Sequence, residues 1–168
     1  MKYGNLIVVD CEASGVSPVN GTMTEFGAVH FASRATFHGR LFEGTPDPEN
    51  PAKPIPGKRV NSDRLIAGRF ASWLEEFPGR KILVSDNPAY DFMWIAGMFD
   101  SAGLENPFGH SGRRISDFWA GLQRDWGNTQ RWKGFRMTPH DHNPVNDAMG
   151  NAEALARIFR EMDDARPV

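Results

Sequence analysis

The strongest constraint on the fold is a short apolar run near the start of the chain that ends in two acidic residues. The run from Leu6 to Val9 is rich in β-branched side chains, and Asp10 and Glu12 follow it closely. Such a run is typical of a buried strand in the middle of a sheet. Side chains two positions apart on a strand point to the same side. The sequence therefore predicts a central strand that carries two carboxylates on one face.

The rest of the chain predicts a mixed sheet. Two further strands, Met23 to Phe31 and Ala35 to Phe42, are joined by a turn around Ser33 and Arg34, which predicts an antiparallel meander. Residues 43–58 carry five prolines and are expected to form an irregular surface loop. Three strands followed by alternating helices and strands predict an α/β fold with helices packed on a mixed central sheet. The later elements are expected as helices at Asn61–Phe77, Pro88 to about Ala102, Asp117 to about Trp126 and from Pro144 onward, and as strands at Lys81–Ser85 and Arg113–Ser116.

Composition favours one globular domain over residues 1–168, since 40% of the residues are hydrophobic. Lys+Arg 19 against Asp+Glu 21 leaves a net charge of -2, so the chain as a whole does not attract nucleic acid or a membrane surface. Any polyanion must be bound locally. Cys11 is the only cysteine and no signal-peptide core or membrane-length segment occurs, so we expect a cytoplasmic protein that does not bind membranes.

The frame Asn-Pro-x-x-Asp occurs twice, from Asn87 to Asp91 and from Asn143 to Asp147. Asparagine is a good residue for the N-cap of a helix, and proline is tolerated at the first helical position. Each frame thus places an aspartate at the fourth residue of a helix. An acid there is stabilised by the helix dipole without any catalytic role, so the frame also has a purely structural interpretation.

A divalent cation would explain the pair Asp10 and Glu12, whose charges repel each other on one face. Mg²⁺ and Mn²⁺ prefer carboxylate oxygens, although a solvated strand end is equally compatible with the pair. His142 stands just ahead of the helix that contains Asp147, and a histidine of near-neutral pKa is suited to take a proton from water. His140 competes for this role.

A zinc site is an alternative use of the same loop. Its ligands would be His140, Asp141, His142 and Cys11, although their spacing is not the ordinary one for zinc ligands.

Three motifs together resemble those of the DEDD superfamily of exonucleases, in its histidine-type (DEDDh) branch. They are "DCEASG" from Asp10, "NPAYD" ending at Asp91, and His142 followed by four residues and Asp147. That branch includes the proofreading subunit of DNA polymerase III, ribonuclease T and oligoribonuclease. "TEFGAV" from Thr24 and "DAMGNAEAL" from Asp147 also resemble the family's second strand and last helix, so the resemblance covers most of the chain outside the proline-rich loop and residues 103–139.

The resemblance implies a ribonuclease H-like fold and a 3′–5′ exonuclease that releases nucleoside 5′-monophosphates. It implies two ions, Mg²⁺ or Mn²⁺, which would stabilise the attacking and leaving oxygens of an in-line displacement from about 4 Å apart. Asp10 would bridge both ions, Glu12 and Asp147 would complete the tighter site, and Asp91 would hold the second ion through water. His142 would deprotonate the water nucleophile.

The resemblance also suggests where a terminal nucleotide would bind. Ser14 and Gly15 match family positions at which the backbone approaches the nucleotide, and Glu25 matches a carboxylate near the terminal sugar. The alternatives are a plain turn for Ser14 and Gly15 and a solvated strand residue for Glu25.

Basic and aromatic residues are concentrated in one stretch, between Arg113 and Arg136. Single-stranded nucleic acid binding needs this mixture of cations for phosphates and rings for base stacking. Phe118 and Trp119 are expected in the core of a helix. The loop that follows is expected to contact substrate through Trp126, Arg131 and Trp132, although the aromatic residues near Trp126 and Trp132 could equally serve a homodimer interface.

Two rival functions remain open at this point. One is a non-catalytic nucleic-acid-binding module with the same fold, and the other is a hydrolase of very short oligonucleotides. The choice between DNA and RNA depends on contacts to the 2′-OH that no motif indicates.

Overall fold

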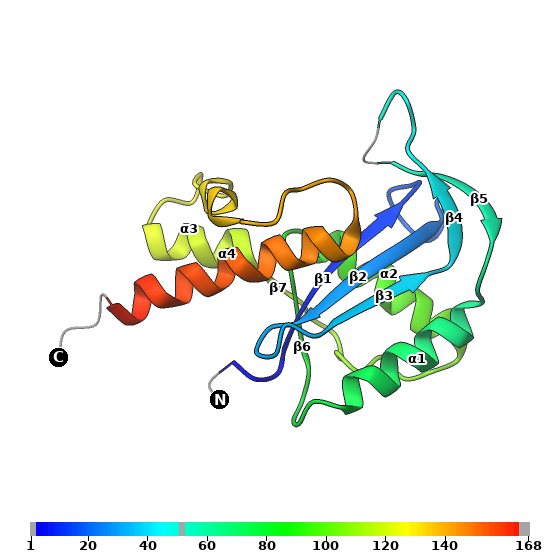
Figure 1. The fold of residues 1–168 in the computed structure, drawn as a ribbon, viewed down its shortest axis with the longest axis horizontal. Coiled ribbons are helices and arrows are strands. Elements are labelled where there is room, and N and C mark those ends of the chain that lie inside the picture. The colour runs from blue at the N-terminus through cyan, green and yellow to red at the C-terminus, as the bar shows by residue number, and fades with distance from the viewer. Residues whose placement is uncertain (1–2, 51–52, 165–168) are drawn as a thin grey trace.

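The computed structural model describes residues 3–50 and 53–164, and its centre is a five-stranded sheet with helices on both faces (Figure 1). β1 (Leu6–Ala13) is the middle strand, antiparallel to β2 (Met23–His30) and parallel to β6 (Ile82–Ser85). β3 (Thr36–Arg40) pairs with β2, and the two-residue β7 (Arg113–Arg114) pairs with β6. The predicted mixed sheet with a central first strand is confirmed.

The helices cover the sheet as two layers. α1 (Asp63–Glu75) and α2 (Pro88–Ala102) lie on one face, whereas α3 (Ile115–Gln123) and α4 (Pro144–Asp164) lie on the other (Figure 1). Each layer encloses its own hydrophobic core. None of these helices, in the part of the chain described here, combines the length and apolar character needed to cross a membrane.

Alternation along β1 decides which face carries the acidic side chains. Ile7, Val9 and Cys11 enter the core under α1 and α2, while Val8 enters the core under α4. Asp10 and Glu12 are in phase with Val8. Their carboxylates therefore point to the α4 side of the sheet.

The proline-rich segment is more regular than the sequence predicts. β4 (Phe42–Thr45) pairs antiparallel with β5 (Ile55–Arg59) in a separate two-stranded sheet, with Pro56 opposite Gly44. A proline is compatible with such a sheet because each strand has an edge at which no N–H is required. The prediction of an irregular loop over residues 43–58 is wrong at both ends of that range.

Smaller differences concern where elements end. α2 has the predicted bounds, and Gly103 ends it with a positive φ of 65°. α3 begins two residues earlier than predicted and ends at Gln123, because Arg124 has left-handed backbone. The loop expected around Trp126 to Arg136 contains a short 3-10 helix, η1 (Arg131–Phe135), which the apolar spacing does not indicate.

Candidate metal centre

β1 and α4 bring three carboxylates together, although they lie far apart in the sequence. One carboxylate oxygen from each of Asp10, Glu12 and Asp147 lies within 4.8 Å of the other two. Glu12 and Asp147 are buried and Asp10 is half-buried. We call these three residues the carboxylate cluster. The sequence predicts all three as ligands of one metal ion, and the fold places them together.

The close approach of α4 to the sheet depends on a glycine in β2. A Cβ at Gly27 would lie 2.2 Å from the backbone carbonyl carbon of Pro144. Only a residue without a side chain therefore allows the first residue of α4 to pack this tightly on the strand. Since Asp147 lies three residues further along, Gly27 fixes the distance of that carboxylate from β1.

The ionised forms of the cluster are disfavoured in the absence of a cation. Burial raises the pKa of Asp10 well above its ordinary value, and the charges of Asp91, Asp147 and Glu12 raise it further. Burial also raises the pKa of Glu12 to about 8, with repulsion from Asp147 as the next cause. A set of crowded carboxylate oxygens suits Mg²⁺ or Mn²⁺, so the residues present fit the metal that the motifs predict.

Asp91 reaches the same end of β1 from α2. Its Oδ1 accepts a hydrogen bond of 3.0 Å from the backbone N–H of Cys11, the residue between Asp10 and Glu12. Burial is the main reason that the pKa of Asp91 is raised to about 7. Among the described residues, the groups with ligand atoms within 4.8 Å of one another do not include Asp91. Its predicted water-mediated contact with a second ion stays a prediction.

Both histidines of the loop before α4 lie at the cluster. Nδ1 of His142 is 4.0 Å from Oε1 of Glu12, and the His142 backbone has a left-handed φ of 61°. Nδ1 of His140 is 2.6 Å from Oδ2 of Asp147. The ring centroids of the two histidines are 4.6 Å apart. His142 is thus placed where a general base is predicted, and His140 makes a contact that its position in the sequence does not specify.

The two copies of Asn-Pro-x-x-Asp are not equivalent in structure. Oδ1 of Asn143 accepts a hydrogen bond of 3.0 Å from the N–H of Val145, as a cap residue does. Asn87 occupies the N-cap position of α2, but its side chain makes no capping hydrogen bond to the described chain. In both copies the proline is the first helical residue and the aspartate is the fourth.

Two residues near the cluster were not predicted as site residues. Arg136, which follows η1, lowers the pKa of Asp10 and, with a smaller effect than His140, that of Asp147, in both cases against the stronger effect of burial. The Tyr90 hydroxyl lies 3.3 Å from the carbonyl oxygens of Ala13 and Gly15, so it ties α2 to the loop after β1. Arg136 ends the basic and aromatic stretch that begins at Arg113, and Tyr90 lies within the first Asn-Pro-x-x-Asp frame. Neither residue stands at a spacing that identifies it as a site residue.

The residues predicted near a terminal nucleotide have structural partners of their own. Oγ of Ser14 accepts a hydrogen bond of 3.1 Å from the N–H of Thr22. A Cβ at Gly15 would lie 2.5 Å from the Cα of Gly21, so the loop closes tightly on itself there. Glu25 lies opposite Glu12 in the β1–β2 register and is 2.6 Å from Nε2 of His38. Their roles toward a nucleotide stay predictions.

One predicted substrate contact is wrong. Trp132 has no exposed surface, and its Nε1–H donates to the carbonyl of Thr129 and to Oγ of Ser116 in the core under α4. It cannot stack on a base or on a second copy of the chain. Trp126 is 84% exposed and Arg131 is also exposed, so both remain available for contacts.

The other aromatic residues of this stretch divide between core and surface. Trp119 is buried as predicted. Phe118 keeps 37% of its surface exposed, although its ring packs edge-on against Phe159. The expectation of a core position is therefore confirmed for Trp119 and is wrong for Phe118.

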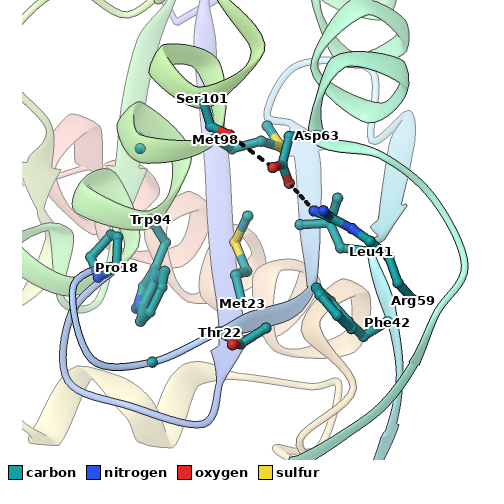
Figure 2. A pocket seen from close by; sticks show the side chains of 12 residues that line it. Pro18, Thr22, Met23, Leu41, Phe42, Arg59, Asp63, Trp94, Met98 and Ser101 are labelled. Atoms are coloured by element: carbon teal, nitrogen blue, oxygen red, sulfur yellow. Dashed lines mark hydrogen bonds and ion pairs between the residues drawn. The ribbon is translucent and has the colours of Figure 1, made fainter.

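A pocket of about 260 Å³ lies on the opposite face of the sheet, between α2, the N-terminus of α1 and the β4 strand (Figure 2). Figure 2 shows Asp63 between Arg59 and Ser101, at 2.8 and 2.9 Å, with Trp94 and Met23 along the wall. Met23 and Trp94 belong to the core under α1 and α2. The pocket is therefore distinct from the carboxylate cluster.

Comparison with known proteins gives a likeness in structure only. No protein-family model and no curated protein sequence matches the chain. The nuclease domain of 3'hExo, described as a DEDDh family member bound to rAMP, superimposes with a TM-score of 0.61 at 13% identity, over 97% of this chain and 94% of that one.

Two structures of E. coli exonuclease I extend the likeness. Its zinc-bound complex with single-stranded DNA gives a TM-score of 0.59 at 14% identity, over 96% of this chain. Its complex with a dT13 oligonucleotide gives 0.61 at 13% identity, over 95% of this chain. The matched region is 41% and 40% of the respective exonuclease I chains, so this protein spans less than half of that enzyme. The chain thus has the ribonuclease H-like fold of the DEDDh nuclease domains.

Proposed function

We propose that this protein is a metal-dependent 3′–5′ exonuclease that hydrolyses phosphodiester bonds at the 3′ end of single-stranded nucleic acid. The observation that carries the proposal is the carboxylate cluster with His142 beside it, on the fold of nuclease domains. Neighbours of the same fold were solved with single-stranded DNA or with rAMP, which supports a nucleic acid substrate.

The metal ligands would be the four acids at the end of β1. Asp10, Glu12 and Asp147 would hold one divalent ion, and Asp10 and Asp91 would share in holding a second. When bound, Mg²⁺ or Mn²⁺ ions neutralise charge on the attacking and leaving oxygens of the phosphate. Arg136 adds a positive charge on the same side, toward Asp10 and Asp147.

His142 would act as the general base. A ring nitrogen of His142 accepts a proton from water, the water oxygen forms a bond to phosphorus, the bond from phosphorus to the 3′ oxygen of the preceding nucleotide breaks, and that oxygen takes up a proton from solvent. The products are a nucleoside 5′-monophosphate and a strand that is one nucleotide shorter. The His142 side chain is 35% exposed, so it can meet a substrate that approaches from solvent.

The strand upstream of the 3′ end would run toward the loop before η1. Trp126 supplies an exposed ring for stacking and Arg131 a cation for a phosphate. Lys133 has Nζ 2.6 Å from Oδ2 of Asp86, which attaches η1 to the turn between β6 and α2. This ion pair keeps the loop on the side of the sheet that carries the carboxylate cluster.

The decisive experiment is a panel of single- and double-stranded DNA and RNA, labelled at the 5′ or 3′ end and incubated with Mn²⁺ or Mg²⁺. The expected result is release of mononucleotides from the 3′ label and a ladder from the 5′ label. Asp10→Ala should be inert, while Asp100→Asn, which removes an exposed charge from α2, should behave as wild type. If the wild type is as inert as Asp10→Ala on every substrate, the protein is not an exonuclease.

Substrate length separates the proposal from its nearest rival. A dinucleotide and a long strand are compared at equal concentrations of 3′ ends. Faster hydrolysis of the long strand is the expected result, because Trp126 and Arg131 would contact upstream nucleotides. A preference for the dinucleotide would instead identify a hydrolase of very short oligonucleotides.

A further inference from the structure

The loop before α4 assembles a second set of possible metal ligands beside the carboxylate cluster. One ligand atom from each of His140, His142 and Asp147 lies within 4.8 Å of the other two. The two imidazole rings meet edge to face at 64°. The loop from residue 136 to residue 143 has no regular structure, and the His140 side chain is 51% exposed, so its ring has solvent around it into which it can turn.

The carboxylate of Asp147 supports a ligand role in this set. Oδ1 of Asp147 accepts a hydrogen bond of 3.2 Å from the N–H of Asp141. Oδ2 is buried and has no hydrogen bond of acceptable geometry within the described residues, although Nδ1 of His140 is only 2.6 Å away. A buried carboxylate oxygen that faces an imidazole nitrogen without a well-directed hydrogen bond is an arrangement that a cation bound to both atoms would satisfy, after the exposed His140 ring moves away from its 2.6 Å contact.

The donor set decides which cation fits. Two imidazole nitrogens and one carboxylate oxygen are ligands for Zn²⁺ and similar transition metals, whereas Mg²⁺ prefers oxygen alone. Zinc–ligand bonds of about 2.0–2.2 Å place neighbouring donors about 3.4 Å apart in a tetrahedral site. We infer that His140, His142 and Asp147 form a transition-metal site for Zn²⁺, which shares Asp147 with the carboxylate cluster that would hold Mg²⁺ but takes its other two ligands from the histidines.

This site shares two residues with the proposed hydrolytic site. A zinc ion bound to a ring nitrogen of His142 removes a lone pair that the general base requires. The same ion engages Asp147, a ligand of the carboxylate cluster. Zinc therefore inhibits hydrolysis in the presence of Mg²⁺. This inhibition rests on the proposed function, but the binding of zinc to the three residues does not depend on it.

The test measures Zn²⁺ binding to the intact protein by competition with a chromogenic chelator, in excess Mg²⁺ and without nucleic acid. His140→Ala is expected to weaken the tightest zinc site by about tenfold or more, since even indirect partners of a metal contribute this much. His110→Ala removes an exposed histidine elsewhere and should leave the affinity within about twofold of wild type. Equal affinities in wild type and His140→Ala would overturn the inference.

A second variant separates the two ligand sets. Glu12→Gln removes a ligand of the carboxylate cluster but none of the proposed zinc site, so zinc affinity should persist while Mg²⁺ binding weakens. Loss of the tightest zinc site in Glu12→Gln would place the ion in the carboxylate cluster and overturn the inference. Co²⁺ serves as a spectroscopic probe, and its visible absorption should change on His140→Ala if imidazole is a ligand. These measurements use no nuclease assay. They therefore test the zinc site even if the protein proves not to be an exonuclease.

Discussion

The acidic residues at the end of β1 are in an unfavourable state when no cation is present. Burial raises the pKa of Glu12 to about 8 and that of Asp91 to about 7, and the pKa of Asp10 is also raised. Each unit by which a folded-state pKa exceeds its unfolded value corresponds to about 1.4 kcal/mol against the ionised form. Charge at this position therefore weakens the fold unless a metal ion compensates it.

Asp10→Asn should stabilise the metal-free protein and reduce the stabilisation that Mg²⁺ provides. The substitution removes one negative charge from the cluster, so the melting temperature of the metal-free protein at pH 8 should rise by a few degrees. Addition of Mg²⁺ should stabilise wild type strongly and the variant little. Thermal denaturation with and without Mg²⁺ checks both effects, with Asp100→Asn as the control. A variant that melts below wild type in the absence of metal would contradict the account of charge repulsion.

His142→Ala should abolish most turnover and leave Mg²⁺ binding nearly intact. Loss of a general base reduces rates by about 10²- to 10⁴-fold. The Mg²⁺ affinity should change little because the carboxylates, and not the imidazole, are the ligands of that ion. Single-turnover kinetics measure the first effect and calorimetric titration with Mg²⁺ the second. If calorimetry shows that Mg²⁺ binding is lost, His142 is a ligand and not a base.

The ordered motifs allowed the four acids and His142 to be predicted, because the spacing of strand and helix positions determines where those side chains point. The partners of His140, Arg136 and Tyr90 depend on the path of loops, which local patterns do not specify. Trp132 was predicted wrongly for a related reason. Composition alone cannot tell which ring of an aromatic and basic stretch enters the core, and here η1 turns Trp132 inward while Trp126 stays exposed.

At the level of elements, the packing of α4 on β2 determines the geometry of the centre. α4 carries Asp147, and the loop before it carries both histidines, so a displacement of its first turn moves three functional groups together. The tolerance for such a displacement is small, because the backbone at Pro144 lies against Gly27 without room for a methyl group. Periodicity predicts that α4 exists and where it begins, but it does not predict which strand it contacts.

Gly27→Ala should therefore damage stability and activity together. The added methyl group must displace the backbone at Pro144, and overpacking of this kind costs about 1–3 kcal/mol. Chemical denaturation measures the loss, and the nuclease assay should show a fall beyond that explained by the unfolded fraction.

Gly68→Ala is the matched control for this substitution. Gly68 lies within α1, and a Cβ there would meet nothing within 4 Å. The change should raise the free energy of unfolding by about 0.5–1 kcal/mol because alanine favours helix over glycine. A Gly27→Ala protein as stable as wild type would show that α4 is not held at this contact.

Prediction from sequence was weakest where an element has few interactions with the main sheet. The β4–β5 pair was missed because its prolines indicate loop, while its stability depends on pairing between residues such as Gly44 and Pro56 that no local pattern shows. β1, β2 and β6 in the main sheet were predicted because burial imposes apolar runs on them. Strand lengths were predicted less well, since β1 continues to Ala13 instead of ending at Val9, β3 is shorter at both ends, and β7 has only two residues.

At the scale of the whole molecule, the sheet separates two different surfaces. The carboxylate cluster and the histidines lie on the α4 side, and the pocket with Trp94 and Met23 lies on the side of α1 and α2. The charges that respond to metal are therefore gathered near the end of β1, with Asp91 reaching them from α2. Their combined titration should be visible in the stability of the entire protein.

The metal-free protein should lose stability as pH rises through the range of the shifted acids. The folded-state pKa values of Glu12 and Asp91, about 8 and about 7, lie above their ordinary values of 4.5 and 3.8. The folded state therefore binds protons more tightly than the unfolded state between these limits. The contribution of these groups to stability is full at low pH and is lost as pH rises toward 8.

Melting curves from pH 5.5 to pH 8.5, with and without Mg²⁺, check this dependence. The stabilisation by Mg²⁺ should increase with pH, because the ion binds the ionised carboxylates. Glu12→Gln should flatten the curve recorded without metal. A constant effect of Mg²⁺ over the whole range would show that the acids are already ionised in the metal-free protein.

The separation of Asp10 and Asp147 along the chain also has a consequence for biosynthesis. A ribosome produces β1 before α4, so the carboxylate cluster lacks one member until the start of α4 has emerged and packed against Gly27. Before that moment the nascent chain holds Asp10 and Glu12 without their third partner and without His142. The proposed nuclease would therefore become active only after the start of α4 has packed against the sheet.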